Sequence, residues 1–274
     1  MIRVGYLGPQ GTFSEEAAEK IFENKDHTRK DFGTIAEILS AVANGIVDDA
    51  VVPVESSLEG AVTATLDVLA GELDLKINGE AVLQITENLL AKKGTRLSEI
   101  TAVYSHPQAI GQCRAFLSRE LSQAEIRHTN STASAAREVL ESAEKHAAIA
   151  SFAAAKAYGL EVIAQGIQDN EGNVTRFLDI AKNYHVKTGD DKTSIVFSTE
   201  DKPGSLYGIL DIFSLWDINM TRIESRPAKS QLGKYIFFVD IQGHIDDDNV
   251  RDALMMVKRK TSYYKFLGSY PRIS

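Results

Sequence analysis

The chain has 274 residues and a formal net charge of −8, with 43% hydrophobic and 25% charged residues. This composition is ordinary for a globular protein, and the length favours two or three domains over one. Tight binding to nucleic acid needs a basic surface, so the acidic charge argues against a nucleic-acid partner. An acidic protein that binds an anionic ligand must concentrate positive potential locally, at an arginine or at helix N-termini.

Cysteine usage and hydropathy argue against disulfides, secretion and membrane insertion. Cys113 is the only cysteine, so no disulfide can form within the chain. The first residues, Met1 to Pro9, read as a strand and a turn and lack the apolar core of a signal peptide. No apolar run approaches the roughly 18 residues that a membrane helix needs. We therefore expect a cytoplasmic protein with no membrane partner.

Residues 1–182 repeat a short apolar strand, a turn that contains a hydroxyl or a glycine, and a helix. The predicted strands are Ile2–Leu7, Ala50–Val54, Thr101–Tyr104, Glu125–His128 and Ala147–Ala150. Thr12 with Glu15, and Thr34 with Glu37, have the capping-box spacing that is typical of helix starts. Strands that alternate with helices indicate an α/β fold with largely parallel sheets.

Two mostly extended segments predict that this α/β region has two lobes. Ile77–Leu90 would carry the chain from a first lobe, about residues 1–78, into a second lobe, residues 79–164. Ala164–Ile180 would carry it back, so that residues 165–182 complete the first lobe. A cleft would then lie between the two lobes.

A segment with little periodicity, residues 183–192, is predicted to be a linker to a separate C-terminal unit, residues 193–274. The unit begins with the alternating strand Thr193–Thr199, and a helix follows Pro203 and Gly204. Two strands joined through Gly233, the second beginning at Lys234, precede another helix and a last strand. The order βαββαβ is that of the ferredoxin-like fold.

The sequence carries no signature of a cofactor or of a metal site. Gly8-Pro9-Gln10-Gly11 is not a dinucleotide-binding loop, and the six histidines lack metal-ligand spacing. Hydroxyl side chains instead follow several strands, and each alone is more typical of a helix cap: Thr12, Ser56, Ser57, Ser105 and Thr129 to Thr132. Together, at the carboxyl ends of strands and at helix N-termini, they favour a cleft that binds a carboxylate.

Arg176 follows a polar, acidic loop and begins a strand with the run Thr175-Arg176-Phe177. From spacing alone, an arginine at a strand edge is more often solvated than functional. If Arg176 projects into a cleft, it would instead clamp a carboxylate through two parallel N–H bonds.

Four blocks of the chain closely resemble the signature blocks of prephenate dehydratases, in the family's order. They are Gly8–Ser14, Val52–Gly60, Ser105–Gln108 and Thr175–Phe177. The C-terminal unit resembles an ACT domain, a small-molecule sensor. The resemblance implies a two-lobed, periplasmic-binding-protein-like catalytic domain that converts prephenate to phenylpyruvate for L-phenylalanine biosynthesis. That reaction expels CO₂ and the ring hydroxyl and needs no cofactor, because aromatisation of the ring drives it.

The resemblance also implies roles for individual residues. Thr175 would hydrogen-bond the departing hydroxyl, and Glu55 would supply or relay a proton. Substrate would be bound by Arg176, Thr12, Ser57, Ser105 and Gln112, while Phe177 would pack behind the motif as structural support. L-Phenylalanine would bind the two sensor blocks, Gly204, Ser205, Leu206 and Tyr207 with Glu224, Ser225, Arg226 and Pro227. Ser56 departs from the asparagine that the family usually has.

The ACT resemblance implies L-phenylalanine as an allosteric effector and a homodimer or homotetramer formed through paired ACT domains. Two other functions stay open. One is arogenate dehydratase, whose substrate has an amino group on the side chain; the other is a non-catalytic amino-acid-binding regulator. The hydroxyl of Thr175 beside Arg176 argues against a pure sensor. Because the dehydratase blocks begin near Met1, we expect no chorismate mutase domain ahead of them.

Overall fold

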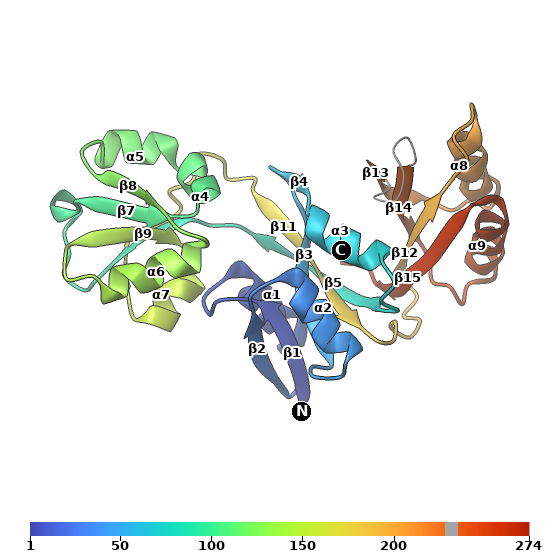
Figure 1. The fold of residues 1–274 in the computed structure, drawn as a ribbon, viewed down its shortest axis with the longest axis horizontal. Helices are drawn as coiled ribbons and strands as arrows, with labels where there is room; N and C mark the ends of the chain where they lie inside the picture. Colours follow the sequence, from blue (N-terminus) through green and yellow to red (C-terminus); the bar gives the residue numbers. More distant parts are fainter. Residues whose placement is uncertain (228–234, 274) are drawn as a thin grey trace.

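The computed structural model describes residues 1–227 and 235–273. Three sheets with flanking helices lie along the long axis of the molecule (Figure 1), with residues 88–164 at one end and the C-terminal unit at the other. The α/β class, the two lobes and the βαββαβ unit predicted from the sequence are confirmed. Within the described residues, no helix is long and apolar enough to cross a membrane.

The first lobe is built on the sheet β2-β1-β3-β11-β5, with β4 paired to β3. Its elements are β1 (Ile2–Leu7), α1 (Phe13–Phe22), β2 (His27–Phe32), α2 (Ile35–Ala43), β3 (Asp49–Ser56), β4 (Gly60–Ala61), α3 (Thr63–Ala70), β5 (Lys76–Gln84) and β11 (Val174–Ala181). Thr12 and Thr34 cap α1 and α2, as their spacing predicted. Strand β1 is parallel to β2 and β3, but β11 is antiparallel to both β3 and β5.

The second lobe is built on the sheet β10-β6-β9-β7-β8. Its elements are β6 (Asn88–Ala91), the 3-10 helix η1 (Leu97–Glu99), β7 (Ala102–Ser105), α4 (Pro107–Gln112), α5 (Arg114–Glu120), β8 (Glu125–His128), α6 (Thr132–Glu141), β9 (His146–Ala150), α7 (Phe152–Tyr158) and β10 (Glu161–Ala164). Strand β7 is parallel to β8 and β9, whereas β6 is antiparallel to β9 and β10. Both sheets are therefore mixed rather than largely parallel, because β11 in the first lobe and β6 in the second run antiparallel to the strands on both sides of them.

The two crossings between the lobes lie side by side. Strand β5 stays in the first sheet as far as Gln84, because it pairs along its length with β11. The outgoing crossing is therefore residues 85–87, whereas the sequence placed the lobe boundary at 78/79, inside β5. The returning crossing is residues 165–173, between β10 and β11. The Ile85 amide donates to the Asn173 carbonyl at 2.8 Å, so the two crossings are joined by a hydrogen bond.

The C-terminal unit is an antiparallel sheet in the order β13-β14-β12-β15. Its elements are β12 (Asp191–Ser198), α8 (Ser205–Leu215), β13 (Met220–Pro227), β14 (Tyr235–Gln242), α9 (Asp248–Lys260) and β15 (Tyr263–Pro271). Helices α8 and α9 cover one face, where Phe197 packs with Phe213 and Leu254. The predicted turn at Gly233 and strand start at Lys234 lie outside the described residues.

The opposite face of this sheet packs against the first lobe. Val196 and Phe238 share one hydrophobic cluster with Leu66 of α3 and Ile77 of β5. Gly268 lies where β15 approaches β5: it has φ +144°, and a Cβ there would be 2.3 Å from the Ile77 carbonyl oxygen. The contact therefore requires glycine, and it joins the C-terminal sheet directly to the lobe that contains β11.

Candidate functional site

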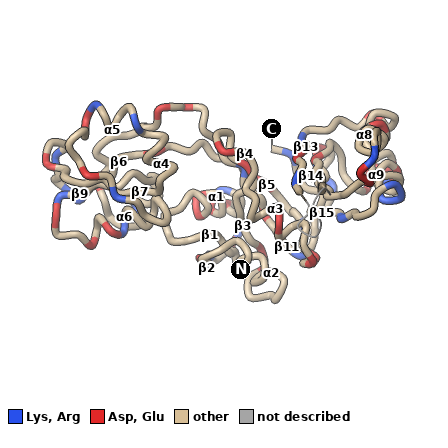
Figure 2. The backbone as a smooth tube through the Cα atoms, turned by 45° about the horizontal axis from the view of Figure 1, so that its top comes forward, with Lys and Arg blue, Asp and Glu red and all other residues tan. Residues whose placement is uncertain are grey.

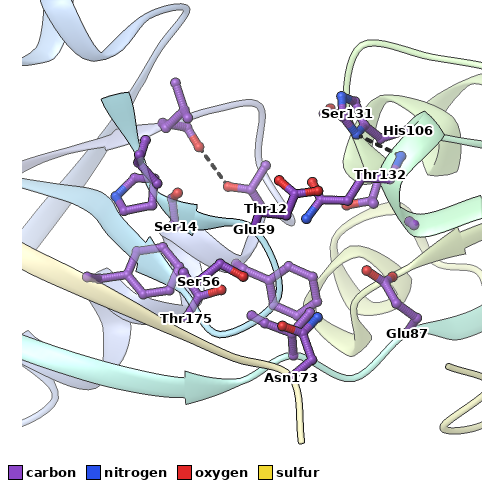
Figure 3. A pocket seen from close by; sticks show the side chains of 18 of the residues that line it. Thr12, Ser14, Ser56, Glu59, Glu87, His106, Ser131, Thr132, Asn173 and Thr175 are labelled. Atoms are coloured by element: carbon purple, nitrogen blue, oxygen red, sulfur yellow. Dashed lines mark hydrogen bonds between the residues drawn. The ribbon is translucent and has the colours of Figure 1, made fainter. Parts of the chain in front are cut away.

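A cavity of about 410 Å³ is enclosed by residues of both lobes and of the crossings between them. This volume is within the range typical of small-molecule sites. Its polar lining side chains include Thr12, Ser14, Ser56 and Thr175 from the first lobe, His106, Gln108, Gln112, Asn130, Ser131 and Thr132 from the second, and Glu87 and Asn173 from the crossings. Figure 3 shows these groups converging on one space.

Strand β11 brings Thr175 and Phe177 to the cavity. Side chains alternate along a strand, so these two lie on one face and Arg176 on the other. Thr175 of β11 is paired with Ser56 of the neighbouring strand β3, and both residues line the cavity. No hydrogen bond of the Thr175 hydroxyl is found among the described residues, so this group is available to a ligand.

Several strand-to-helix turns reach the cavity as predicted, although their hydroxyls also serve the helices. The Thr12 hydroxyl donates to the Leu7 carbonyl at 2.8 Å and accepts from the Glu15 amide at 3.4 Å. Gln112 accepts a hydrogen bond from the Asn173 side chain at 3.0 Å, so the amide of one lobe is joined to the returning crossing. Ser131 caps α6, where its hydroxyl accepts from the Ser134 amide at 3.0 Å.

Two of the serines predicted to bind substrate do not line the cavity. Ser105 is fully buried and donates to the Ile149 carbonyl at 2.7 Å. The Ser57 hydroxyl donates to the Gly172 carbonyl at 3.1 Å and accepts from the Val174 amide at 3.0 Å. Ser57 therefore holds the returning crossing, and Ser56 is the serine of this pair that lines the cavity.

Arg176 and Glu55 face the C-terminal unit instead of the cavity. Arg176 Nε lies 2.6 Å from Glu80 and Nη1 lies 2.8 Å from Asp240, while Nη2 donates to the Tyr270 hydroxyl at 2.9 Å. Although burial opposes it, the Arg176 charge lowers the pKa of Asp240. Glu55 Oε2 lies 3.1 Å from Arg222 Nε of β13. The sequence left two positions open for Arg176, one in solvent and one in the cleft. It occupies neither, because its guanidinium is held in the contact between the first lobe and the C-terminal unit.

Glu87 lines the cavity, and sequence reasoning missed it. It lies on the outgoing crossing, only 3% exposed, and its Oε2 has no hydrogen-bond partner among the described residues. Burial raises the pKa of this carboxyl to about 7. Figure 3 shows the side chain directed into the cavity above Asn173. The available sequence signal was a single acid in the otherwise mostly apolar and neutral stretch Leu83–Leu90.

Among the described lining residues there is no lysine or arginine. Lys and Arg are interspersed with Asp and Glu over all three parts of the molecule, with no single basic face in view (Figure 2). Positive potential in the cavity therefore comes from backbone amides at the N-termini of α1 and α6, each ten residues long. Within residues 1–227 and 235–273, no group of three or more His, Cys, Asp or Glu side chains is arranged to hold a metal ion.

The two sensor blocks lie on different elements of the C-terminal unit. Gly204, at φ +81°, caps α8, and Ser205 and Leu206 line a smaller cavity of about 160 Å³ together with residues of β14. The second block, Glu224 to Pro227, lies on the edge strand β13. Arg226 donates to the Thr63 carbonyl at 2.8 Å and is 2.6 Å from Asp67, both on α3. Within one chain, the described lining of the smaller cavity includes none of the second block.

Comparisons with known proteins support the family resemblance of both the two-lobed part and the C-terminal unit. Residues 4–185 match the prephenate dehydratase family model, and residues 193–255 match the ACT domain model. A bifunctional chorismate mutase/prephenate dehydratase of Aquifex aeolicus is 43% identical over 99% of this chain and 74% of that protein. A prephenate dehydratase of Mycobacterium tuberculosis is 37% identical, covering 99% and 87%. The solved prephenate dehydratase of Arthrobacter aurescens in complex with L-Phe is 40% identical, with a TM-score of 0.91 over 99% of this chain and 90% of that one.

Proposed function

Because the chain belongs to the prephenate dehydratase family, we propose that it converts prephenate to phenylpyruvate in L-phenylalanine biosynthesis. The observation that carries the proposal is the cavity between the lobes, which Thr175 lines with a hydroxyl that has no hydrogen-bond partner among the described residues. A cytoplasmic location is part of the proposal, as the sequence predicted, and fractionation of the host cell would test it.

The reaction breaks two bonds of the substrate. The ring carboxylate leaves as CO₂, and its electron pair becomes a ring double bond while the bond to the ring hydroxyl breaks. The departing hydroxide takes up a proton and leaves as water. Because the product ring is aromatic, the protein needs only to orient the substrate and assist the hydroxyl. Thr175 would polarise that hydroxyl by a hydrogen bond, since a threonine alcohol is too weak an acid to donate its proton outright.

The substrate carboxylates would be bound by backbone amides rather than by Arg176. The first turns of α1 and α6 each offer free N–H groups and a partial positive charge at the cavity wall. Gln112 and Asn173, joined by their own hydrogen bond, and the Ser56 hydroxyl add neutral polar contacts. This arrangement accommodates a small dianion without a buried cation.

The test is phenylpyruvate formation by the purified protein, with prephenate and with L-arogenate as alternative substrates. We expect turnover of prephenate, and the ratio of kcat/KM for the two substrates will decide between dehydratases for prephenate and for arogenate. Folded protein that converts neither substrate would contradict the proposal and would favour the non-catalytic sensor.

We further propose that L-phenylalanine, found with the Arthrobacter aurescens relative, is the effector of this chain. The contacts of β13 offer a route to the cavity. Arg226 contacts α3, and the segment that precedes α3 contributes Ser56, Glu59 and Val62 to the cavity wall. A ligand that moves β13 would therefore displace that wall. Two measurements would test this coupling. L-Phenylalanine should suppress turnover, and because coupling is reciprocal, its affinity for the protein should differ with and without bound substrate. Equal affinities would contradict the coupling.

The effector site is proposed to form between two copies of the chain. Among the described strands, β13 is at the edge of its sheet and is paired with β14 alone. The C-terminal unit also exposes large apolar side chains: Tyr207 at 70% and Leu215 at 71% on α8, with Ile223 on β13 and Tyr235 on β14. Pairing of two such sheets would cover these groups and bring the two sensor blocks of different copies together. Light scattering would test for the expected dimer or tetramer, and a monomer at micromolar concentration would contradict it.

A further inference from the structure

The position of Glu87 is fixed by its backbone at the junction of the two lobes. Its amide donates to the Gln168 side chain at 3.0 Å, and its carbonyl accepts from the Ile167 amide at 2.9 Å. Both partners belong to the returning crossing, so Glu87 is held between the two segments that connect the lobes. Glu87 is only 3% exposed and yet borders the cavity.

Among the residues that the structure describes, no cation balances this carboxyl. Buried carboxylates in proteins are normally paired or fully hydrogen-bonded, because isolated burial of a charge is costly. Glu87 has no ion pair among the described residues, and its Oε2 has no hydrogen-bond partner there. Among the described buried carboxyls with an unpartnered oxygen, Glu87 is the one that borders the cavity between the lobes.

The titratable groups around Glu87 come from several elements. His106 and Glu59 line the same cavity from α4 and from the segment before α3. Away from the cavity, the Cys113 thiol lies near Glu87. The pKa of this thiol is raised mainly by burial, and further by the nearby Glu87 and Asp169. Of these neighbours, His106 is the one basic side chain.

We propose that Glu87 selects the substrate by charge: its neutral form admits the dianion prephenate, and its ionised form favours the amino counterpart L-arogenate. The inference rests on the proposed function. An ionised Glu87 would repel a ligand that carries two carboxylates, because the described lining of the cavity holds no lysine or arginine and burial weakens dielectric screening. L-Arogenate brings an ammonium group that pairs with the same carboxylate. When neutral, the carboxyl donates a hydrogen bond to an oxygen of prephenate.

The experiment measures kcat/KM for both substrates between pH 6 and pH 9, for the wild type and for Glu87→Gln. Because the carboxyl titrates at about pH 7, kcat/KM of the wild type for prephenate should fall about tenfold per pH unit above that value, roughly a hundredfold by pH 9. The value for L-arogenate should not fall along with it. Where L-arogenate is not turned over, its inhibition constant against prephenate replaces kcat/KM. Glu87→Gln should keep the preference between the substrates constant to within about threefold over this range.

His106→Asn is the control, because His106 is the basic side chain among the described lining residues of the cavity. If Glu87 is responsible, the loss of prephenate turnover above pH 7 persists in His106→Asn and disappears in Glu87→Gln. The reverse result overturns the inference. So does a wild-type preference between the two substrates that is the same at pH 6 and pH 9. Absence of turnover at every pH with both substrates contradicts the proposed function itself.

A second measurement keeps the test independent of the folding of Glu87→Gln. Thr175→Ala slows turnover enough for calorimetry of prephenate binding at pH 8 in two buffers of different ionisation enthalpy. Binding of prephenate should take up about one proton, because the ionised Glu87 must become neutral. L-Arogenate should bind without proton uptake. No uptake with prephenate would contradict the inference.

Discussion

Two regions of the molecule that bury charged side chains treat them differently. In the contact between the first lobe and the C-terminal unit, Arg176 and Lys192 lie against Glu80 and Asp240, so two cations face two anions. In the cavity between the lobes, Glu87 is buried, and the described part of the chain places no cation beside it. Charges that hold two parts of a protein together are balanced within the protein, whereas a charge left unbalanced at a cavity is available to a ligand.

Strand β11 belongs to both regions, because its alternating side chains face them in turn. Thr175 borders the cavity with a free hydroxyl, and the next residue, Arg176, has its guanidinium bound by three partners. One strand therefore connects the proposed chemistry to the contact with the sensor unit. Substitutions on its two faces should have different consequences, one on turnover and the other on stability.

The largest effect is expected on the cavity face. Thr175→Ala removes the hydroxyl that would polarise the leaving group, and we expect kcat with prephenate to fall by roughly 10²–10⁴-fold. Thr175→Ser, which keeps the hydroxyl, should recover most of that loss. The unfolding transition of both variants should match that of the wild type. Near-normal turnover by Thr175→Ala would remove this residue from its proposed role.

On the opposite face, Arg176→Met should lower stability more than turnover. It leaves Asp240 buried without its principal counter-charge, and breaking a buried pair costs about 3–5 kcal/mol of unfolding free energy. Denaturant unfolding measures this loss, and turnover below the transition should stay within a few-fold of the wild type.

Arg3→Met is the matched control, because Arg3 pairs with Asp48 at 2.7 Å with half of its side chain exposed. Its unfolding free energy should be almost unchanged, since exposed pairs contribute little. Equal losses in the two variants would contradict the distinction between a balanced buried cluster and a surface pair. A selective loss of turnover in Arg176→Met would instead support a carboxylate-binding role.

Glu87 should affect the pH dependence of the unfolding free energy as well as the substrate specificity. Its pKa is raised to about 7 by burial, so folding favours the neutral form. The stability that this group contributes is complete below the pKa of the unfolded chain and is lost as the pH rises through about 7. Glu87→Gln should therefore be more stable than the wild type by roughly 2–3 kcal/mol at pH 8, and about equal to it at pH 4.5. The difference between the two unfolding free energies, measured at both pH values, tests this; a difference independent of pH would contradict it.

Local sequence signals predicted the elements well, because caps and apolar alternation act over a few residues. Thr34 with Glu37 forms the predicted capping box, and β1 has its predicted bounds. The family blocks located the right segments, but a block does not say which face of a strand each residue occupies. In the second block, Ser56 lines the cavity while its neighbours Glu55 and Ser57 do not.

What could not be predicted depends on contacts that are distant in sequence. The partners of Arg176, Glu80 and Asp240, are 96 and 64 positions away. They meet it only because the C-terminal sheet packs on the first lobe. The high pKa of Glu87 likewise arises from burial between two crossings, which composition cannot reveal.

The smallest effect is expected from Glu55→Gln, although the family resemblance implied catalysis by this residue. Its side chain is 41% exposed, and it lies 3.1 Å from Arg222 on the face of β3 away from the cavity. We expect kcat with prephenate to stay within about threefold, and unfolding free energy to fall by less than about 1 kcal/mol, as for a partly exposed ion pair. Because Arg222 is on β13, the concentration of L-phenylalanine that halves turnover should shift more than kcat does. A loss of kcat as large as that of Thr175→Ala would mean that both faces of the sheet act in the reaction. The division between a charge-balanced contact that stabilises the fold and a cavity that performs the chemistry would then be wrong.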